Sequence, residues 1–388
     1  MEHDYGKIVA AAKAGAEKSF EAQMGLLQKF CSINCGSRNV AGNKKVVELV
    51  DQVLREIGAD VEHIDSEEYG TYIVARLKPE SPDGKVILNA HLDSAFFDDR
   101  VEDHPFRIDG EYAYGLGIAD CKGGVVTILY AVKSMKEAGL LPNKEIVIIF
   151  NCDEEVGSLI GKQIFKREAP GAEAAICFEP ARNKNGILTV RRGLALGKIV
   201  VRGIAAHAGL DGGVGASAVR ELANLIIKLT DRSDLSIGMN YNVAPISGGG
   251  NTVVVADYAQ ASFCVPIDSP EVFERTKKDV LEYLPKQGIV PGCTIETSIE
   301  MEFPAMVRND ENVKLYERIR RAGELMGLEL PEEKSSNPAD CGFFSELGVP
   351  VVDGLGTYMY SIHTTDEHML TRTLTERTQL LGILLATI

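Results

Sequence analysis

The sequence predicts an α/β fold, in which a mixed and mainly parallel sheet carries helices on both faces and a smaller ferredoxin-like domain is inserted. Strands of consecutive apolar residues alternate with helices in the first part of the chain, and such strands are typical of parallel sheets that are covered on both faces. The order of elements then changes near residue 190. A chain of 388 residues is also longer than the chains that usually fold around a single hydrophobic core, so we expect two domains.

The first part of the chain has the apolar spacing of helices at 18–30, 43–57 and 123–138. Between them lie short runs of aliphatic and β-branched residues, such as VIL at 86–88 and IVIIF at 146–150. Runs of this kind predict strands at 71–77, 85–90, 145–152 and 174–180. Helices and apolar strands that alternate in this way favour a layered α/β sheet.

From residue 194 the order becomes β-α-β-β-α-β, which is the split βαβ pattern of a ferredoxin-like sandwich. Its predicted elements, in chain order, lie at 194–203, 217–230, 239–247, 252–265, 270–284 and 293–303. The α/β pattern then resumes with predicted helices at 309–326 and 341–347, a strand at 349–355 and a closing helix from Leu374. The sequence therefore predicts one α/β domain in two parts, 1–192 and 304–388, around an inserted domain at 193–303.

Net charge, hydropathy and cysteine usage limit the expected partners and location of the protein. The formal net charge of −15 disfavours nucleic acids and anionic membranes, because both bind basic surfaces. No apolar stretch of the sequence is long enough to span a bilayer, and its start, MEHDYGKIVAAAKAG, lacks the basic and apolar regions of a signal peptide. The eight cysteines form no C-x-x-C pair, which is typical of reduced thiols. We therefore expect a cytoplasmic protein.

Histidines and carboxylates follow the predicted α/β strands at the positions where those strands end. The set comprises His91 with Asp93, Asp120, the run Asp153 to Glu155, Glu179 and His363. In open α/β sheets, ligands bind in the crevice at the carboxyl ends of the strands. Each part has a simpler explanation when taken alone: a solvated turn for H-L-D, a surface charge run for D-E-E, and a surface histidine near the end of the chain.

Taken together, these residues indicate a metal site. Three carboxylates gathered with two imidazoles in one crevice would raise their own pKa values unless a cation lay among them. Carboxylate and imidazole ligands suit zinc, with manganese or cobalt as substitutes. The segment GLGIAD at 115–120 does not indicate a dinucleotide loop instead, because Asp120 replaces the third glycine of G-x-G-x-x-G.

Six motifs occur in order along the chain: HLD at 91–93, GLGIADCKGG at 115–124, CDEEVGS at 152–158, FEP at 178–180, RGIAAHAG at 202–209 and a late histidine. In this order the chain resembles the dinuclear zinc peptidase family of glutamate carboxypeptidase, acetylornithine deacetylase, succinyl-diaminopimelate desuccinylase and peptidase T. The lid sequence is most similar to the glutamate carboxypeptidase branch. The resemblance implies a zinc-peptidase-like catalytic domain, with residues 193–303 as a lid and dimerisation domain.

Carried over by position, the resemblance implies two zinc ions per chain. His91 and Glu179 would hold one ion, and Glu155 and His363 would hold the other. Asp120 would bridge the two ions. Manganese or cobalt could replace zinc at such a ligand set.

The resemblance also implies two catalytic residues beside the ligands. Asp93 would orient His91, since residues i and i+2 share a strand face and a zinc-bound imidazole hydrogen-bonds to a carboxylate. Glu154 would be the general base for a hydroxide held between the metal ions. The family bends the chain after the bridging aspartate, so we expect a cis peptide bond between Asp120 and Cys121.

Three further positions match the family. The histidine at the position of His207 reaches the active site of the partner subunit in the family and helps to stabilise the oxyanion. The resemblance therefore implies a homodimer that forms through the inserted domain. Asn251, in GGGNTVVVAD, and Asp340, in NPADCGFF, match substrate-binding positions.

The chain departs from the family where many members bind the free carboxylate of the substrate. Pro266 and Phe303 stand at the places of two arginines. We expect Phe303 to face an apolar or aromatic side chain of the substrate instead. Three arginines are candidates to replace the missing cations, although a solvated surface arginine is the simpler explanation for each: Arg191, Arg192 and Arg308.

The sequence therefore predicts a zinc-dependent hydrolase that cleaves an amide bond in a small peptide, as a carboxypeptidase or dipeptidase does. An N-acyl amino-acid deacylase of the same chemistry is the alternative. A third hypothesis is a metal-binding or regulatory protein on this fold that has no catalytic activity. The presence of Glu154 next to the ligand set disfavours the third hypothesis.

Overall fold

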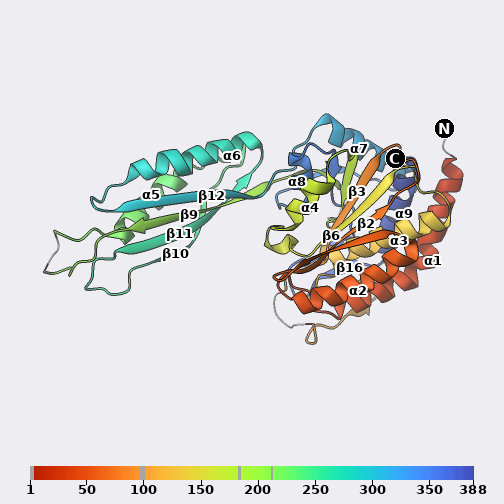
Figure 1. Cartoon of the computed structure of the whole chain (residues 1–388), viewed down its shortest axis with the longest axis horizontal. Helices are drawn as coiled ribbons and strands as arrows, with labels where there is room; N and C mark the ends of the chain where they lie inside the picture. The colour runs from red at the N-terminus through yellow and green to blue at the C-terminus, as the bar shows by residue number, and fades with distance from the viewer. Residues whose placement is uncertain (1–3, 97–100, 182–184, 211–212) are drawn as a thin grey trace. The chain divides into compact units, whose positions relative to one another are not determined.

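The computed structural model describes residues 4–96, 101–181, 185–210 and 213–388. The chain divides into two compact units (Figure 1). The α/β unit comprises Met1–Val190, Arg308–Lys334 and Ala339–Ile388, and the inserted unit comprises Arg191–Val307 and Ser335–Pro338. None of the helices in the described part of the chain has the length and hydropathy of a membrane-spanning segment.

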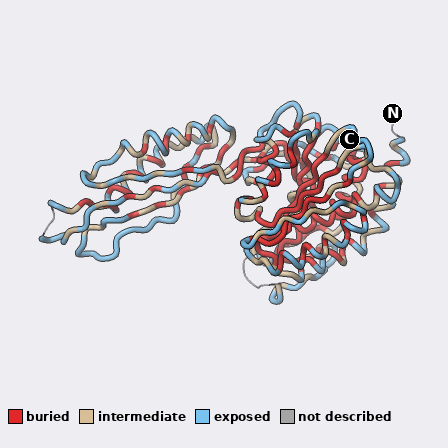
Figure 2. Tube along the Cα trace, viewed as in Figure 1, coloured by how far each residue is buried: buried red, intermediate tan, exposed pale blue. Residues whose placement is uncertain are grey.

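A six-stranded sheet forms the centre of the α/β unit, in the order β1-β2-β6-β3-β7-β14. Strand β3 pairs in parallel with β6 and β7, and β7 pairs in parallel with β14, whereas β1 and β2 are antiparallel. The bounds are Asp60–Ser66 for β1, Gly70–Leu77 for β2, Lys85–His91 for β3, Glu145–Asn151 for β6, Ala174–Cys177 for β7 and Val351–Val352 for β14. The apolar residues of β3 and β6 are buried on both faces (Figure 2), which confirms the predicted mainly parallel sheet.

Helices cover both faces of this sheet (Figure 1). Helices α1, α3 and α9 pack against one another, α2 packs on β2, and α4 and α8 pack together with α8 on β7 and β14. The bounds are Tyr5–Cys31 for α1, Val40–Ile57 for α2, Gly124–Glu137 for α3, Gly161–Glu168 for α4, Asp310–Glu324 for α7, Cys341–Glu346 for α8 and Arg372–Thr387 for α9. The first helix begins well before the predicted start at residue 18, because its alanine-rich first turns favour a helix without a regular apolar stripe.

A smaller sheet of the α/β unit, in the order β15-β16-β5-β4, carries the loop 361–367. Its strands are Arg107–Asp109 (β4), Tyr112–Tyr114 (β5), Met359–Tyr360 (β15) and His368–Leu370 (β16). Side chains stack in a row across it: the Arg107 guanidinium lies 3.5 Å from the Tyr114 ring centroid, and the His368 ring lies 4.6 Å from Tyr114 and 4.9 Å from Tyr360. The contact between Tyr360 and His368 joins the two ends of loop 361–367.

The inserted unit has an antiparallel sheet in the order β10-β11-β9-β12, with α5 and α6 on one face (Figure 1). The bounds are Gly193–Arg202 for β9, Ala218–Thr230 for α5, Asn242–Gly248 for β10, Tyr258–Ile267 for β11, Pro270–Lys277 for α6 and Thr294–Phe303 for β12. Phe263 and Val265 of β11 form one core with Leu222 and Leu225 of α5. The order of the elements along the chain and the order of the strands in the sheet confirm the predicted ferredoxin-like arrangement.

The remaining strands, β8 (Ile187–Arg191) and β13 (Glu332–Ser335), pair with each other.

Candidate metal centre and active site

Five side chains that the sequence singled out as metal ligands gather in the α/β unit. His91 is the last residue of β3, Glu155 lies on a short turn after β6, and Glu179 follows β7 by two residues. Asp120 lies in the segment Ile118–Gly123 that leads into α3, and His363 lies in the loop between β15 and β16. The parallel strands β3, β6 and β7 therefore deliver their ligands to the same edge of the sheet.

Asp120 lies between two imidazoles. Its Oδ1 is 3.1 Å from Nε2 of His91, and its Oδ2 is 3.1 Å from Nε2 of His363. Nε2 of His91 is also 3.5 Å from Oε1 of Glu179, and Nε2 of His363 is 3.5 Å from Oε2 of Glu155. The five side chains thus form two groups of three, which share the Asp120 carboxylate.

The charges of this cluster fit a cation. Burial and the neighbouring Asp120 raise the pKa of Glu155 to about 8, and burial and Glu179 raise the pKa of Glu154. Burial also acts to raise the pKa of Asp120, but hydrogen bonds with His363 and His91 outweigh it and lower that pKa. Oε1 of Glu155 is buried without a hydrogen-bond partner in the described part of the chain. Carboxylate oxygens and imidazole nitrogens are donors that zinc binds, and Oε1 of Glu155 is available as one of them.

Asp93 ties the end of β3 to the turn that follows β6. Nδ1 of His91 is 2.9 Å from the backbone oxygen of Asp93 and 3.3 Å from its carboxylate Oδ1. The Asp93 carboxylate accepts hydrogen bonds from Ser37 Oγ at 2.7 Å and from the backbone N–H groups of Glu154 and Glu155 at 3.3 and 3.2 Å. Nδ1 of His91 is therefore occupied, which leaves Nε2 to face Asp120 and Glu179.

The loop that carries Asp120 is held by Glu367, a residue that no motif of the sequence marks. The Glu367 carboxylate accepts hydrogen bonds from the backbone N–H groups of Gly117 at 3.2 Å, Ala119 at 2.9 Å and Asp120 at 3.2 Å. Glu367 is only 1% exposed. The Asp120–Cys121 peptide bond is cis, which confirms that expectation. In the sequence Glu367 resembles a surface residue of the polar loop TTDEH, and no local signal marks its distant partners.

Asp340 is buried at 2% exposure in a network of polar side chains. It accepts hydrogen bonds from Asn151 Nδ2, at 2.7 Å, and from the Ser158 hydroxyl. Burial raises the pKa of Asp340 to about 7, and its charge contributes to the raised pKa of Glu154. Asp340 thus contacts Asn151 and Ser158, which lie on either side of Glu154 in the sequence, and its predicted part in substrate binding stays a prediction.

His207, Asn251 and Phe303 belong to the inserted unit, whereas the ligand cluster belongs to the α/β unit. Nδ1 of His207 accepts hydrogen bonds from the backbone N–H groups of Gly209 and Leu210, both at 3.2 Å. The neutral ring therefore carries its hydrogen on Nε2, and the residue is exposed. Asn251 is also exposed, while Phe303 ends β12 at 6% exposure.

The three candidate arginines are all engaged within their own units. Arg192 forms an ion pair with Asp268 at 2.7 Å, and Arg308 forms one with Glu332 at 2.7 Å. Arg191 is 7% exposed and donates a hydrogen bond to the backbone oxygen of residue 337 at 3.3 Å. Only Arg191 is buried, whereas Arg308 is an exposed surface arginine, as the simpler explanation expected.

Comparisons with known proteins agree with this geometry. Residues 87–387 match the model of peptidase family M20/M25/M40. Carboxypeptidase G2 of Pseudomonas sp. (strain RS-16) is 27% identical over 346 residues, which cover 87% of this chain and 82% of that protein. Acetylornithine deacetylase of Vibrio atlanticus is 27% identical over 199 residues, half of each chain.

The fold is also similar to that of a solved aminopeptidase structure. Aminopeptidase PepT from Bacillus cereus superposes with a TM-score of 0.79 at 20% identity, over 95% of this chain and 98% of that one. The family match and these relatives support metal-dependent hydrolysis of amide bonds in peptides or N-acyl amino acids. The chain belongs to the peptidase family M20/M25/M40.

Proposed function

We propose that this chain is a zinc-dependent peptidase of carboxypeptidase or dipeptidase type, which cleaves an amide bond in a small peptide at the cluster around Asp120. The observation that carries the proposal is the pair of ligand groups that share this carboxylate, with His91 and His363 each 3.1 Å from one of its oxygens. Glu154 lies next to one ligand and provides the base that hydrolysis requires. The 27% identity to carboxypeptidase G2 over most of the chain favours a peptidase.

Two zinc ions per chain fit this donor set. His91 and Glu179 would hold one ion, Glu155 and His363 the other, and Asp120 would contact both. Bound zinc lowers the pKa of a water molecule and polarises a carbonyl oxygen. Manganese and cobalt accept the same oxygen and nitrogen donors and are plausible substitutes.

The side chains around the ligands supply proton transfer and orientation. Burial and Glu179 raise the pKa of Glu154, and a carboxylate with raised proton affinity suits a base that takes a proton from water and gives it to the leaving nitrogen. Asp93 orients His91 and holds the backbone of the Glu154 turn. His207, with its hydrogen on Nε2, would donate a hydrogen bond to the oxyanion.

The inserted domain, residues 193–303, would act as a lid and form a homodimer. Val219 and Ile227 of α5 are 44% and 59% exposed, and Ile246 of β10 is 58% exposed. Strand β10 is an edge strand of its sheet. Exposed apolar side chains beside an unpaired edge favour association with a second copy. His207 would then serve the active site of the partner subunit.

A cytoplasmic location agrees with the state of the thiols. All eight cysteines are free, and six of them are buried. Disulfides are common in secreted proteins and rare in reducing compartments. The proposal is therefore an enzyme of the cytoplasm that acts on small peptides.

The proposal is tested by comparing dipeptides and C-terminally extended peptides with N-acetyl amino acids as substrates of the zinc-loaded enzyme. We expect the peptides to have the higher kcat/KM, and a preference for N-acetyl amino acids would favour the deacylase instead.

Glu154→Gln should lower kcat by about 10²–10⁴-fold without changing the zinc content, since it removes a general base and keeps the size of the side chain. Glu346→Gln, at an exposed position of α8, is the matched control. Turnover of neither class, or a Glu154→Gln variant with the wild-type rate, would show that the proposal is wrong.

A further inference from the structure

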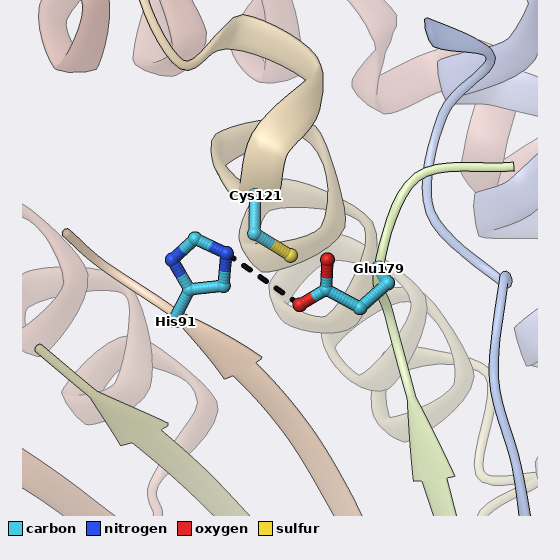
Figure 3. Close-up of side chains that lie close together, drawn as sticks. All are labelled: His91, Cys121 and Glu179. Carbon is cyan, nitrogen blue, oxygen red and sulfur yellow. Dashed lines mark ion pairs between the residues drawn. The ribbon is translucent and has the colours of Figure 1, made fainter. Parts of the chain in front are cut away.

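Cys121 follows Asp120 in the chain and lies inside the ligand cluster (Figure 3). Its Sγ, a ring nitrogen of His91 and a carboxylate oxygen of Glu179 all lie within 4.8 Å of one another. The side chain is 0% exposed. Figure 3 shows the sulfur facing the space between the His91 ring and the Glu179 carboxylate. Cys121 therefore lies where it could supply a fourth donor to the ion that His91, Glu179 and Asp120 would hold.

The separation of these atoms is close to what one metal ion imposes. Zinc binds thiolate sulfur at about 2.3 Å and imidazole nitrogen at about 2.0–2.1 Å. Two such donors on one ion are thus at most about 4.4 Å apart. Since the atoms of this group lie within 4.8 Å of one another, a shift of a few tenths of an ångström in a side chain brings them into range.

We propose that Cys121 is a further ligand of the metal ion held by His91 and Glu179, and that it binds as a thiolate. The inference rests on the metal centre described under the proposed function and deepens it. On binding, the S–H bond breaks, a sulfur–metal bond forms, and the proton passes to solvent. The sulfur–metal bond would replace the hydrogen bond that Sγ of Cys121 donates to the backbone oxygen of Phe178, 2.9 Å away.

A thiolate would change the metal preference of this half of the centre. With Asp120, Glu155 and Glu179 it would bring four negative charges against the four positive charges of two divalent ions. Thiolate ligands select thiophilic ions such as zinc or cadmium over manganese, which prefers carboxylates and water. The site of His91 and Glu179 should therefore discriminate against manganese, while the site of Glu155 and His363 should not.

The test uses cadmium, because a cadmium–thiolate bond gives a ligand-to-metal charge-transfer band in the ultraviolet that cadmium–carboxylate and cadmium–imidazole bonds do not give. Metal-free protein is titrated with cadmium under reducing conditions, and the bound metal is counted by atomic spectroscopy in the same samples. We expect the wild type to develop the charge-transfer band as it binds cadmium, and Cys121→Ser to bind cadmium without the band. Zinc affinity of one site should fall by about tenfold or more in Cys121→Ser, and manganese affinity by less, since even outer partners of zinc ligands contribute about 10–100-fold.

Cys341→Ser is the matched control, because Cys341 is also buried and its thiol also faces a backbone oxygen, that of Ala339 at 3.9 Å. This variant should keep the band. Cys121→Ala provides a second replacement in case the serine variant does not fold. A wild-type protein that binds cadmium without the band, or a Cys121 variant that keeps the band, would overturn the inference. Failure of the wild type to bind cadmium or zinc at all would refute the metal centre itself.

Discussion

Asp120 is the residue on which both halves of the proposed centre depend, because its two oxygens face different imidazoles. Asp120→Ala should therefore remove both metal ions and not only one. We expect the metal content of protein purified without chelator to fall from about two ions per chain to well below one. Atomic spectroscopy measures this directly, with the exposed Asp366→Ala as control. A variant that retains one tightly bound ion would contradict the bridging role.

Two residues set an expectation for substrate selectivity. By the family resemblance of the sequence, Pro266 and Phe303 are expected at the places of two carboxylate-binding arginines, and Arg192 and Arg308 form ion pairs with Asp268 and Glu332. Charge-assisted hydrogen bonds contribute about 1.5–3 kcal/mol each. We therefore expect the preference in kcat/KM for a peptide over its C-terminal amide to be at least about tenfold weaker than in an enzyme that has both arginines. An amide that is poorer by about a hundredfold or more would mean that another cation binds the carboxylate.

The ligand residues could be predicted from the sequence, but the residues that support them could not. His91 and Glu179 are recognisable because each ends or follows an apolar strand within a short motif. The partners of Glu367 are backbone N–H groups about 250 positions away in the chain, with sequence separations from 247 to 250. Backbone donors leave no trace in residue type, so only the folded chain reveals such a contact.

At the scale of elements, the loop that carries Asp120 depends on Glu367, whose carboxylate accepts three of its backbone N–H groups. Glu367→Ala would leave these buried donors unpaired, which should lower the free energy of unfolding by about 1–3 kcal/mol. It should also weaken zinc binding by about 10–100-fold, because the loop no longer fixes Asp120. Chemical denaturation of metal-free protein measures the first effect, and chelator competition measures the second.

Glu367→Gln is the informative companion to this variant, since it keeps an acceptor oxygen and loses the charge. It should fall between the wild type and Glu367→Ala in both measurements. Glu333→Ala, at a half-buried position of β13, controls for the loss of a glutamate elsewhere in the α/β unit. Wild-type zinc affinity in Glu367→Ala would show that the loop holds Asp120 without this carboxylate.

Most long buried strands and amphipathic helices were predicted within a few residues, although α1 begins at Tyr5 and not at residue 18, whereas several short or exposed elements were missed. Strand β3 was expected at 85–90 and spans Lys85–His91. Strand β1, Asp60–Ser66, was not expected, because it lies at the sheet edge and its sequence DVEHIDS has few apolar residues. The sheet β15-β16-β5-β4 was also missed, since its strands have only two or three residues and depend on pairing partners far along the chain.

At the scale of the whole molecule, the residues with a proposed part in catalysis are divided between the two units. The metal ligands and Glu154 belong to the α/β unit, and His207 belongs to the inserted unit. The exposed edge strand β10 and the apolar residues Val219 and Ile227 of α5 favour a dimer. If the dimer places His207 at the site of the other subunit, two differently inactivated chains can complete one site between them.

This leads to a complementation experiment. His207→Ala and Glu154→Gln chains, each inactive alone, are mixed under conditions that exchange subunits. In a heterodimer the His207→Ala chain keeps its own Glu154 and receives His207 from the Glu154→Gln chain, so one of two sites is complete. Random exchange makes half of the dimers heterodimers, and we expect about a quarter of the wild-type kcat, since the base and the oxyanion donor are each present at about half of the sites and are present together at about one site in four. The control pairs His207→Ala with a chain that carries both substitutions, which cannot complete a site. Recovery no greater than in this control, with exchange confirmed by mass spectrometry, would mean that His207 acts within its own chain or has no part in catalysis.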